Sequence, residues 1–198
     1  MEAENLILKK IQINKGYITS KELSKMNINR FYISKLEKEG KLEKIKRGLY
    51  RDTNKIVENE IFELNKILPL GVLCLESAAE YYGLTMVIPN KYKLAIKRNT
   101  RITLPEYPPI KIYYYSEKNY KLGIAEIEKE GKILKIYDIE KTVCDIVKYR
   151  NKIGLDIYKE VLKNYLARPE RNISKLIKYS KITKTYKVLN QALELILW

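Results

Sequence analysis

The stretch from residue 29 to residue 51, "NRFYISKLEKEGKLEKIKRGLYR", constrains the fold more than any other part of the chain. Its first half predicts a helix that ends at Gly40, with an inward stripe made of Phe31 or Tyr32, Ile33, Leu36 and, just beyond the helix, Leu42. Its second half alternates between apolar and charged side chains and turns at Arg47-Gly48, where a tight hairpin favours glycine. A short helix should therefore run directly into a cationic two-stranded hairpin.

Two further helices are predicted before this stretch. The first ends at Gly16 and carries apolar side chains at helical spacing: Leu6, Ile7, Ile11 and Ile13. Thr19 or Ser20 is placed to cap the second helix, with Glu22 returning the hydrogen bond as in a capping box. Asn29 is placed to cap the third helix in the same way.

Three helices followed by a hairpin predict a winged helix-turn-helix domain over residues 1–53. In such domains one helix enters the major groove of DNA, and the hairpin, or wing, reaches the flanking phosphates or the minor groove. The predicted DNA contacts are Arg30, Tyr32, Ser34 and Lys35 in the groove, Thr19, Ser20 and Lys21 at phosphates beside a helix N-terminus, and Lys44, Lys46, Arg47 and Arg51 in the wing. Two alternatives stay open, because any one of these residues can be ordinary solvated surface and some winged helices bind only protein.

The net charge of +15 is unevenly distributed along the chain. Residues 1–52 carry 13 Lys and Arg against 7 Asp and Glu, residues 53–151 carry 16 against 13, and residues 152–198 carry 10 against 4. A codon bias towards A+T would also raise the lysine content, but it gives no reason for two basic ends around a nearly balanced centre. The distribution favours a polyanionic partner, here double-stranded DNA whose phosphates are engaged by both ends of the chain.

Several classes of protein are disfavoured by what the sequence lacks. The absence of histidine removes Ser-His-Asp and Cys-His catalysis and the commonest zinc ligand. The only cysteines, Cys74 and Cys144, lie in apolar segments and are expected to be free buried thiols. The longest apolar stretch, at residues 67–75, is too short to cross a bilayer, and the N-terminus does not read as a signal peptide. We therefore expect a cytoplasmic protein without a membrane segment, cofactor or metal.

Residues 54–198 are predicted to form a second, α/β domain of the α+β type. Helical spacing occurs at 56–68, 71–85, 139–150, 154–166, 172–181 and 184–196. Runs of β-branched and aromatic residues predict strands at 92–98, 110–116, 122–131 and 132–138. Asp138 is placed to cap the helix that follows the last strand. The expected domain has a small, mostly antiparallel sheet and several helices.

One part of this domain resembles a catalytic motif, the Glu130-Gly131-Lys132 sequence. A nuclease of the restriction type needs an acidic residue upstream of such a motif, on a strand that can hold a metal ion. No aspartate occurs between Asp52 and Asp138, and Glu130 falls in a predicted turn. We therefore expect that the protein is not an enzyme, and a nucleic-acid enzyme of this type stays as the alternative.

Read from end to end, the chain resembles the AbiEi antitoxin family, the transcriptional regulators of type IV toxin-antitoxin systems. The motifs that carry the resemblance are, in chain order, Arg47-Gly48-Leu49-Tyr50 at the hairpin, "LESAAEYYGLT" at 75–85 followed by Pro89, and "YDIEKTVCDIVKYRNKIGLDI" at 137–157. The last motif is similar to the family pattern Glu-Arg-Thr-x-x-Asp, formed here by Glu140, Lys141, Thr142 and Asp145. Lysine in place of arginine keeps the charge but removes the planar bidentate fork.

The resemblance implies two activities. The winged helix would repress its own operon at inverted repeats in the promoter, and the second domain would counteract a nucleotidyltransferase-like toxin, without a stable complex, in an abortive-infection system of phage defence. The resemblance also implies an antitoxin surface at Glu140, Lys141, Thr142 and Asp145. Capping and packing at the start of their helix is the alternative role for these four residues.

Overall fold

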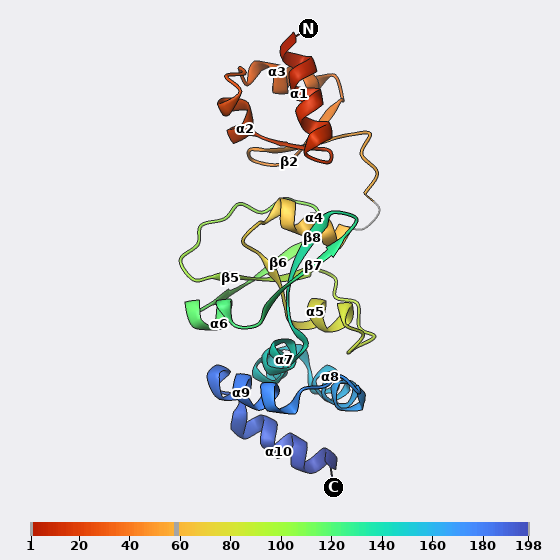
Figure 1. The fold of residues 1–198 in the computed structure, drawn as a ribbon, viewed down its shortest axis with the longest axis vertical. Helices are drawn as coiled ribbons and strands as arrows, with labels where there is room; N and C mark the ends of the chain where they lie inside the picture. The colour runs from red at the N-terminus through yellow and green to blue at the C-terminus, as the bar shows by residue number, and fades with distance from the viewer. Residues whose placement is uncertain (1, 58–59, 198) are drawn as a thin grey trace. The chain divides into compact units, whose positions relative to one another are not determined.

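The protein is described here by a computed structural model, which describes residues 2–57 and 60–197. The chain forms two compact units, the first made of Met1–Ile67 with Arg101–Pro108 and the second of Leu68–Thr100 with Pro109–Trp198 (Figure 1). The first unit extends beyond residue 53, where the sequence places the domain boundary, because helix α4 and the 101–108 segment group with it. Each unit is described by itself below.

The first unit contains a three-stranded sheet and four helices among its described residues. Its elements are α1 (Glu2–Ile13), β1 (Tyr17–Thr19), α2 (Ser20–Lys25), α3 (Phe31–Lys38), β2 (Leu42–Lys46), β3 (Leu49–Asp52) and α4 (Glu60–Ile67). The strand order is β1-β3-β2, and both pairings are antiparallel. This arrangement confirms the predicted winged helix-turn-helix, with β2 and β3 as the wing.

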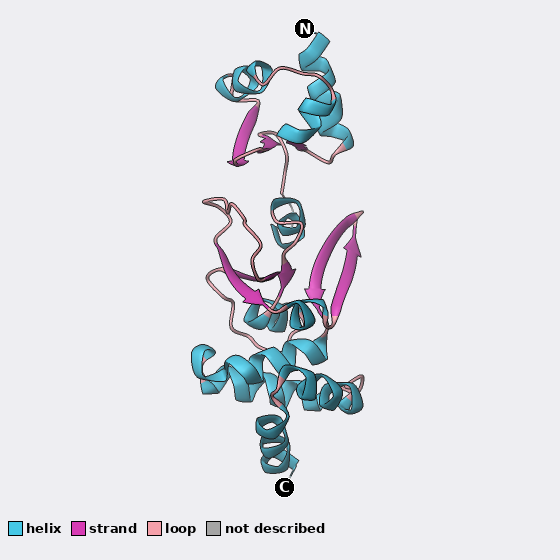
Figure 2. Ribbon diagram, turned by 90° about the vertical axis from the view of Figure 1, so that its left-hand side faces the viewer, coloured by secondary structure: helices cyan, strands magenta, loops and turns pink. Residues whose placement is uncertain are grey.

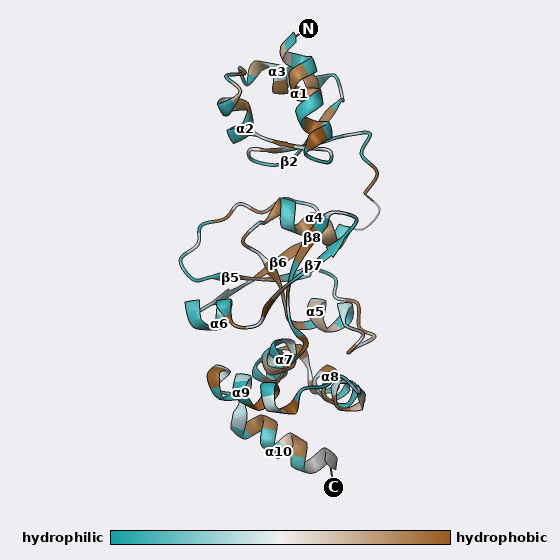
Figure 3. Ribbon diagram, viewed as in Figure 1, coloured by the Kyte–Doolittle hydropathy of each residue, from teal (hydrophilic) through white to brown (hydrophobic). Residues whose placement is uncertain are grey.

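The core of the winged helix is formed by one face of each helix and by the first strand. Its buried side chains are Ile7, Ile11, Ile18, Leu23, Ile33, Leu36 and Leu42. The prediction that Leu6 and Ile13 also face inward is wrong, because α1 buries only the stripe through Ile7 and Ile11 and leaves those two side chains 46% and 73% exposed. Figure 3 shows hydrophobic and hydrophilic residues mixed along α1, as burial of one face requires.

The helix ends follow the predicted capping chemistry with one shift. Thr19 caps α2 in a full capping box with Glu22, as predicted. Gly16 adopts a φ of 90° after α1, a conformation that favours glycine. Asn29 does not occupy the cap position of α3, because the helix begins at Phe31 and Arg30 precedes it directly. The Asn29 side chain instead accepts a hydrogen bond from the Phe31 amide at 2.9 Å.

The second unit places a five-stranded sheet beside a group of helices (Figure 2). Its elements are β4 (Val72–Leu73), α5 (Leu75–Tyr81), β5 (Tyr92–Lys97), β6 (Ile110–Tyr115), α6 (Glu117–Lys121), β7 (Ile124–Lys129), β8 (Lys132–Tyr137), α7 (Ile139–Ile153), α8 (Leu155–Ala167), α9 (Ile173–Thr183) and α10 (Tyr186–Leu197). The α+β class is confirmed, and so are the four predicted strands.

The sheet is mixed, where the sequence predicted a mostly antiparallel one. Its strand order is β6-β5-β4-β8-β7, with antiparallel pairing of β7 to β8 and of β4 to β5. The other two pairings, β5 to β6 and β4 to β8, are parallel. The segment from 98 to 109 carries the chain back to the start of β5, so β6 runs parallel to it. The middle strand, β4, lies where the sequence predicted the beginning of a helix.

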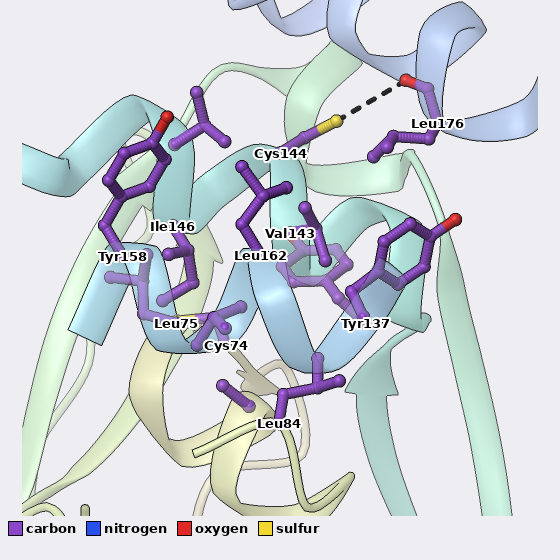
Figure 4. Close-up of a cluster of buried hydrophobic side chains, with 14 of the residues drawn as sticks. Cys74, Leu75, Leu84, Tyr137, Val143, Cys144, Ile146, Tyr158, Leu162 and Leu176 are labelled. Atoms are coloured by element: carbon purple, nitrogen blue, oxygen red, sulfur yellow. Dashed lines mark hydrogen bonds between the residues drawn. The ribbon is translucent and has the colours of Figure 1, made fainter. Parts of the chain in front are cut away.

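The core of the second unit lies among α5, α7, α8 and the sheet (Figure 4). Cys74 and Cys144 are both buried in it as free thiols, as predicted. The Cys144 Sγ lies 3.7 Å from the Leu176 carbonyl oxygen, which it approaches as a weak donor. Burial raises the pKa of both thiols, so they stay protonated near neutral pH.

Candidate nucleic-acid interface

The outward face of α3 is the part of the winged helix predicted to enter the major groove. Arg30, Ser34 and Lys35 are exposed on or next to this helix, as the prediction requires. Tyr32 is different, because its ring is half-buried and packs against the core of the winged helix. Phe31, next to it, is 65% exposed. The aromatic ring that this face presents to solvent is therefore that of Phe31 and not that of Tyr32.

Lys35 is exposed but already has an acidic partner. Its Nζ lies 2.7 Å from Glu4 Oε1 on α1 and 3.8 Å from Glu39 Oε1 at the end of α3. The hydrogen bond with Lys35 lowers the pKa of Glu4, and the same contact raises the pKa of Lys35. A phosphate or base contact by Lys35 would therefore compete with Glu4 for the ammonium group.

The N-terminus of α2, where the sequence predicts phosphate contacts, is capped by a carboxylate of the chain itself. The Thr19 hydroxyl donates to Glu22 Oε2 at 2.7 Å, and the Thr19 amide donates to the same oxygen at 2.8 Å. The Ser20 amide donates to the Gly48 carbonyl at 3.0 Å. The Thr19 hydroxyl and the Ser20 amide thus have partners within the chain, and phosphate contacts by Thr19 and Ser20 stay a prediction.

Glu22 is held as an anion by these contacts. Burial raises the pKa of Glu22, but hydrogen bonds from the Thr19 side chain and backbone and from Asn14 outweigh it, so the pKa lies below its ordinary value. Asn14 Nδ2 donates to Glu22 Oε1 at 2.7 Å. Glu22 therefore fixes the entry to α2 and adds negative charge there.

The tip of the wing projects two cations into solvent. Lys44 and Arg47 are both exposed, on β2 and at the turn that follows it. Gly48 completes the turn with a φ of 81°, which confirms the predicted glycine turn. The pairing of β2 with β3 shifts register between Lys44 and Lys46, so a bulge separates these two side chains.

The other two predicted wing residues are half-buried and have partners. Arg51 Nε donates to Glu43 Oε1 at 2.6 Å, and these residues are paired across β2 and β3. Lys46 Nζ donates to the Thr103 carbonyl at 3.4 Å. Neighbouring strands and the 101–108 segment thus hold Arg51 and Lys46, and their contact with DNA stays a prediction.

Four predicted contacts are cations that are exposed and free of ion pairs within the described part of the chain: Lys21, Arg30, Lys44 and Arg47. We call them the open cations. They come from α2, from the residue before α3, and from the wing. The sequence predicted all four, but it also predicted several others that local partners neutralise. The prediction did not identify the exposure of Phe31, because the helical spacing left Phe31 and Tyr32 equally suited to the core.

The residues proposed as an antitoxin surface on α7 are buried. Relative exposure is 6% for Glu140, 0% for Lys141 and Thr142, and 2% for Asp145. These four side chains present no surface to a partner, because α5, α8 and α9 pack around α7. The alternative role, capping and packing, is the one observed.

A buried ion pair organises this part of α7. Lys141 Nζ lies 2.5 Å from Asp145 Oδ2 and sits over the rings of Tyr137 and Tyr115, at 4.3 and 4.7 Å from their centroids. The Tyr115 hydroxyl donates to the same Asp145 oxygen at 3.1 Å. Burial raises the pKa of Asp145, and Lys141 opposes that rise. The ammonium group of Lys141 makes this contact with Asp145 without the planar fork of an arginine.

Glu140 has its own partners beside this pair. Its Oε2 lies 2.9 Å from Lys175 Nζ on α9, and its Oε1 accepts from the Tyr165 hydroxyl at 3.3 Å. Asp138 caps α7, as predicted, by accepting from the Lys141 amide at 2.8 Å. The motif therefore ties α7 to α8 and α9.

The structure also bears on the nuclease alternative and on membranes. Glu130 and Gly131 both adopt positive φ in the turn between β7 and β8, so the Glu-x-Lys sequence is not on one strand. Over residues 2–57 and 60–197, no group of three or more Cys, Asp or Glu side chains is placed to hold a metal ion. In the same residues no helix combines the length and the apolar character needed to span a bilayer.

The comparisons with known proteins agree with the fold and with the N-terminal resemblance. The crystal structure of RV2827C protein from Mycobacterium tuberculosis superimposes with a TM-score of 0.52 at 11% identity, over 94% of this chain and 78% of that one, which shows a shared fold. No curated protein sequence was found to match the chain. Residues 5–51, which span the winged helix described above, match the model of the family described as "Transcriptional regulator, AbiEi antitoxin", so in this segment the chain carries the sequence pattern of the AbiEi regulators.

Proposed function

We propose that this protein is a DNA-binding autorepressor that binds inverted repeats in its own promoter. One observation supports this proposal above the others: four cations, Lys21, Arg30, Lys44 and Arg47, stand exposed and without ion pairs in the described part of a winged helix. Unpaired surface cations on α2, α3 and a wing are suited to displacing counterions from the DNA backbone. The matched family consists of transcriptional regulators, which agrees with this use of the domain.

The mechanism divides the work between helix and wing. Arg30 lies at the N-terminal end of α3, where a recognition helix contacts base edges, and an arginine there can bind guanine with two hydrogen bonds. Arg47 and Lys44 lie at the wing and suit phosphates, which carry no sequence information. The contact of the basic C-terminal end of the chain with phosphates stays a prediction without assigned residues.

A direct test is a gel-shift titration of the full chain with the promoter fragment upstream of its own gene and with an unrelated duplex of equal length. We expect tighter binding to the promoter fragment, and repression of a reporter that carries it. Absence of retardation of both duplexes at low salt would contradict the proposal. Retardation of both with equal affinity would leave DNA binding but remove the claim of sequence recognition.

The antitoxin part of the proposal rests on the resemblance and on the name of the matched family. We propose that the second unit counteracts a nucleotidyltransferase toxin without forming a stable complex. Co-expression with a nucleotidyltransferase encoded beside it should restore growth. Arg47→Ala should still restore growth, since that residue belongs to the wing. Failure of the unaltered chain to restore growth would contradict this part alone.

A second candidate function is a protein-docking role for the winged helix. Phe31 favours it, because a 65% exposed aromatic ring on α3 can serve as an anchor for a protein surface. The two functions separate cleanly by experiment. Phe31→Ala should leave non-specific DNA affinity unchanged if DNA is the partner of the wing, whereas a docking role predicts that DNA retardation is absent from the start.

A further inference from the structure

The first unit contains a cavity that the proposed function does not use. Its volume is about 460 Å³, within the range of about 300–1,000 Å³ typical of small-molecule sites. It is lined by β2 and β3 of the wing, by α4, and by the segment from Leu104 to Pro108. Three residues predicted from the sequence to contact DNA, Lys44, Lys46 and Arg51, line this cavity.

Two cations of the lining, Lys44 and Lys46, have no ion pair in the described residues, and of the two only Lys46 is half-buried. Arg51 is paired with Glu43 at 2.6 Å, and Glu63 is paired with Lys55 at 2.9 Å. Lys46 has a carbonyl as its hydrogen-bond acceptor and no ion pair in the described residues. Burial lowers the pKa of Lys46, because its ammonium group has lost part of its water. An anion at Lys46 would restore that lost solvation with a charge-assisted hydrogen bond.

The rest of the lining suits a ligand that also carries hydrogen-bond donors and an apolar face. Glu60 and Glu106 contribute carboxylates, which accept hydrogen bonds from O–H or N–H groups. The phenol of Tyr107 is hydrogen-bonded to Glu60, and that contact raises its pKa. The lining segment that contains Leu104, Pro105 and Tyr107 contributes a ring and apolar surface, which we call the apolar wall and which suits a flat ligand.

We propose that this cavity binds a nucleoside monophosphate or a closely similar phosphorylated metabolite, with its phosphate at Lys46. The sugar hydroxyls and the amino groups of the base supply the donors that Glu60 and Glu106 accept, and the base supplies the flat face for the apolar wall. A free phosphate would satisfy Lys46 alone, and a nucleoside would satisfy the carboxylates and the apolar wall alone. Binding therefore depends on both halves of the ligand.

The test uses the full chain with AMP, GMP, CMP and UMP, followed by thermal unfolding and by isothermal titration calorimetry. Inorganic phosphate and adenosine are the two half-ligands. At least one of the four monophosphates should raise the Tm and release or absorb heat with saturation, and the half-ligands should each bind about tenfold more weakly or worse. No saturable binding by any of the four monophosphates would overturn the proposal, and so would inorganic phosphate binding as tightly as the best of them.

Two variants locate the site. Lys46→Gln should weaken binding about tenfold by removing the cation, and Leu104→Trp should abolish binding by filling the cavity. The matched controls are Lys38→Gln, an exposed lysine on α3, and Leu6→Trp, an exposed leucine on α1. Circular dichroism of each variant checks that it folds. Equal binding by Lys46→Gln and Lys38→Gln would contradict the assigned site.

If the bound monophosphate changes the affinity for DNA, the ligand regulates DNA binding. This step rests on the proposed function. The open cation Lys44 also lines the cavity, so the negative charge of a bound monophosphate should weaken the contact of the wing with DNA. The two claims fail separately, because calorimetry measures the ligand without DNA and the gel shift measures DNA without ligand.

Discussion

Helices α3 and α7 both carry charged residues that the sequence offered as contacts for a partner, and the structure treats them in opposite ways. On α3, Ser34 and Lys35 remain at the surface with Arg30 beside them. On α7, Lys141 and Asp145 are almost completely buried and paired with each other. α3 spans 8 residues with one face on the core, whereas α7 spans 15 residues and packs against four other helices, α5, α8, α9 and α10. The number of elements that pack around a helix thus decides whether its charged side chains stay at the surface or become buried in the core.

This difference also shows how far the sequence could predict the fold. The strands β5 to β8 were predictable because each is a run of β-branched and aromatic residues bounded by Gly, Pro or a charged turn. The short strand β4 was missed because two residues, Val72 and Leu73, fit a helical pattern as well as a strand. The parallel pairing of β5 with β6 depends on the path of a long connection, which local pattern does not encode.

The candidate site was predictable in its architecture and less so in its individual contacts. The turn at Gly48 and the capping box of Thr19 follow from local chemistry, and both are observed. The pairing of Lys35 with Glu4 joins residues far apart in the chain, and Lys46 meets the Thr103 carbonyl in the same way. Such tertiary partners removed several cations from the predicted interface, and no periodicity in the sequence signals them.

The largest effect is expected from breaking the buried pair on α7. Asp145→Ala leaves the Lys141 ammonium buried without its carboxylate, and should lower the free energy of unfolding by about 3–5 kcal/mol. Urea unfolding followed by circular dichroism measures the change. The double variant Lys141→Met with Asp145→Leu should recover most of the loss, since it removes both charges together. A loss below about 1 kcal/mol for Asp145→Ala would show that the pair is not a packing element of the unit.

The next effect separates base recognition from phosphate contact in the winged helix. Arg30→Ala should weaken binding to the promoter fragment by about 1–3 kcal/mol and affect an unrelated duplex much less. Arg47→Ala should weaken binding to both duplexes alike. Gel-shift titration of each variant on each duplex gives the comparison. Equal losses on both duplexes for both variants would contradict the division of roles.

A smaller effect is expected at the capping box of α2. Thr19→Ala should cost about 1 kcal/mol of stability, because it removes the hydroxyl that the cap uses. Since the pKa of Glu22 is lowered in the folded state, its contribution is present above its ordinary pKa of 4.5 and is lost as the pH falls through the folded-state value. Unfolding measured across acid pH should therefore show a shallower decline for Glu22→Gln than for the unaltered chain. If stability declined identically in Glu22→Gln and in the unaltered chain, protonation of Glu22 would not contribute to the acid loss of stability.

The smallest effect tests whether Lys35 on α3 binds DNA once its acidic partner is removed. Glu4→Gln removes the acidic partner that holds Lys35 at 2.7 Å. If Lys35 then contacts a phosphate, the slope of log K against log salt should steepen by about 0.9. Glu2→Gln, an exposed acid on the same helix, is the matched control. An unchanged slope in Glu4→Gln would place Lys35 away from the DNA.

The most direct test of the central claim is the salt dependence of DNA binding when the open cations are removed together. The full chain is compared with a variant in which Lys21, Arg30, Lys44 and Arg47 are changed to Gln, using the promoter fragment. The matched control changes four exposed lysines outside the interface to Gln: Lys66, Lys91, Lys118 and Lys129. The account predicts that the slope of log K against log salt loses about 3 units in the first variant, for the three cations assigned to phosphates, and stays unchanged in the control. Equal slopes for the first variant and the unaltered chain would contradict the claim that these four residues bind DNA.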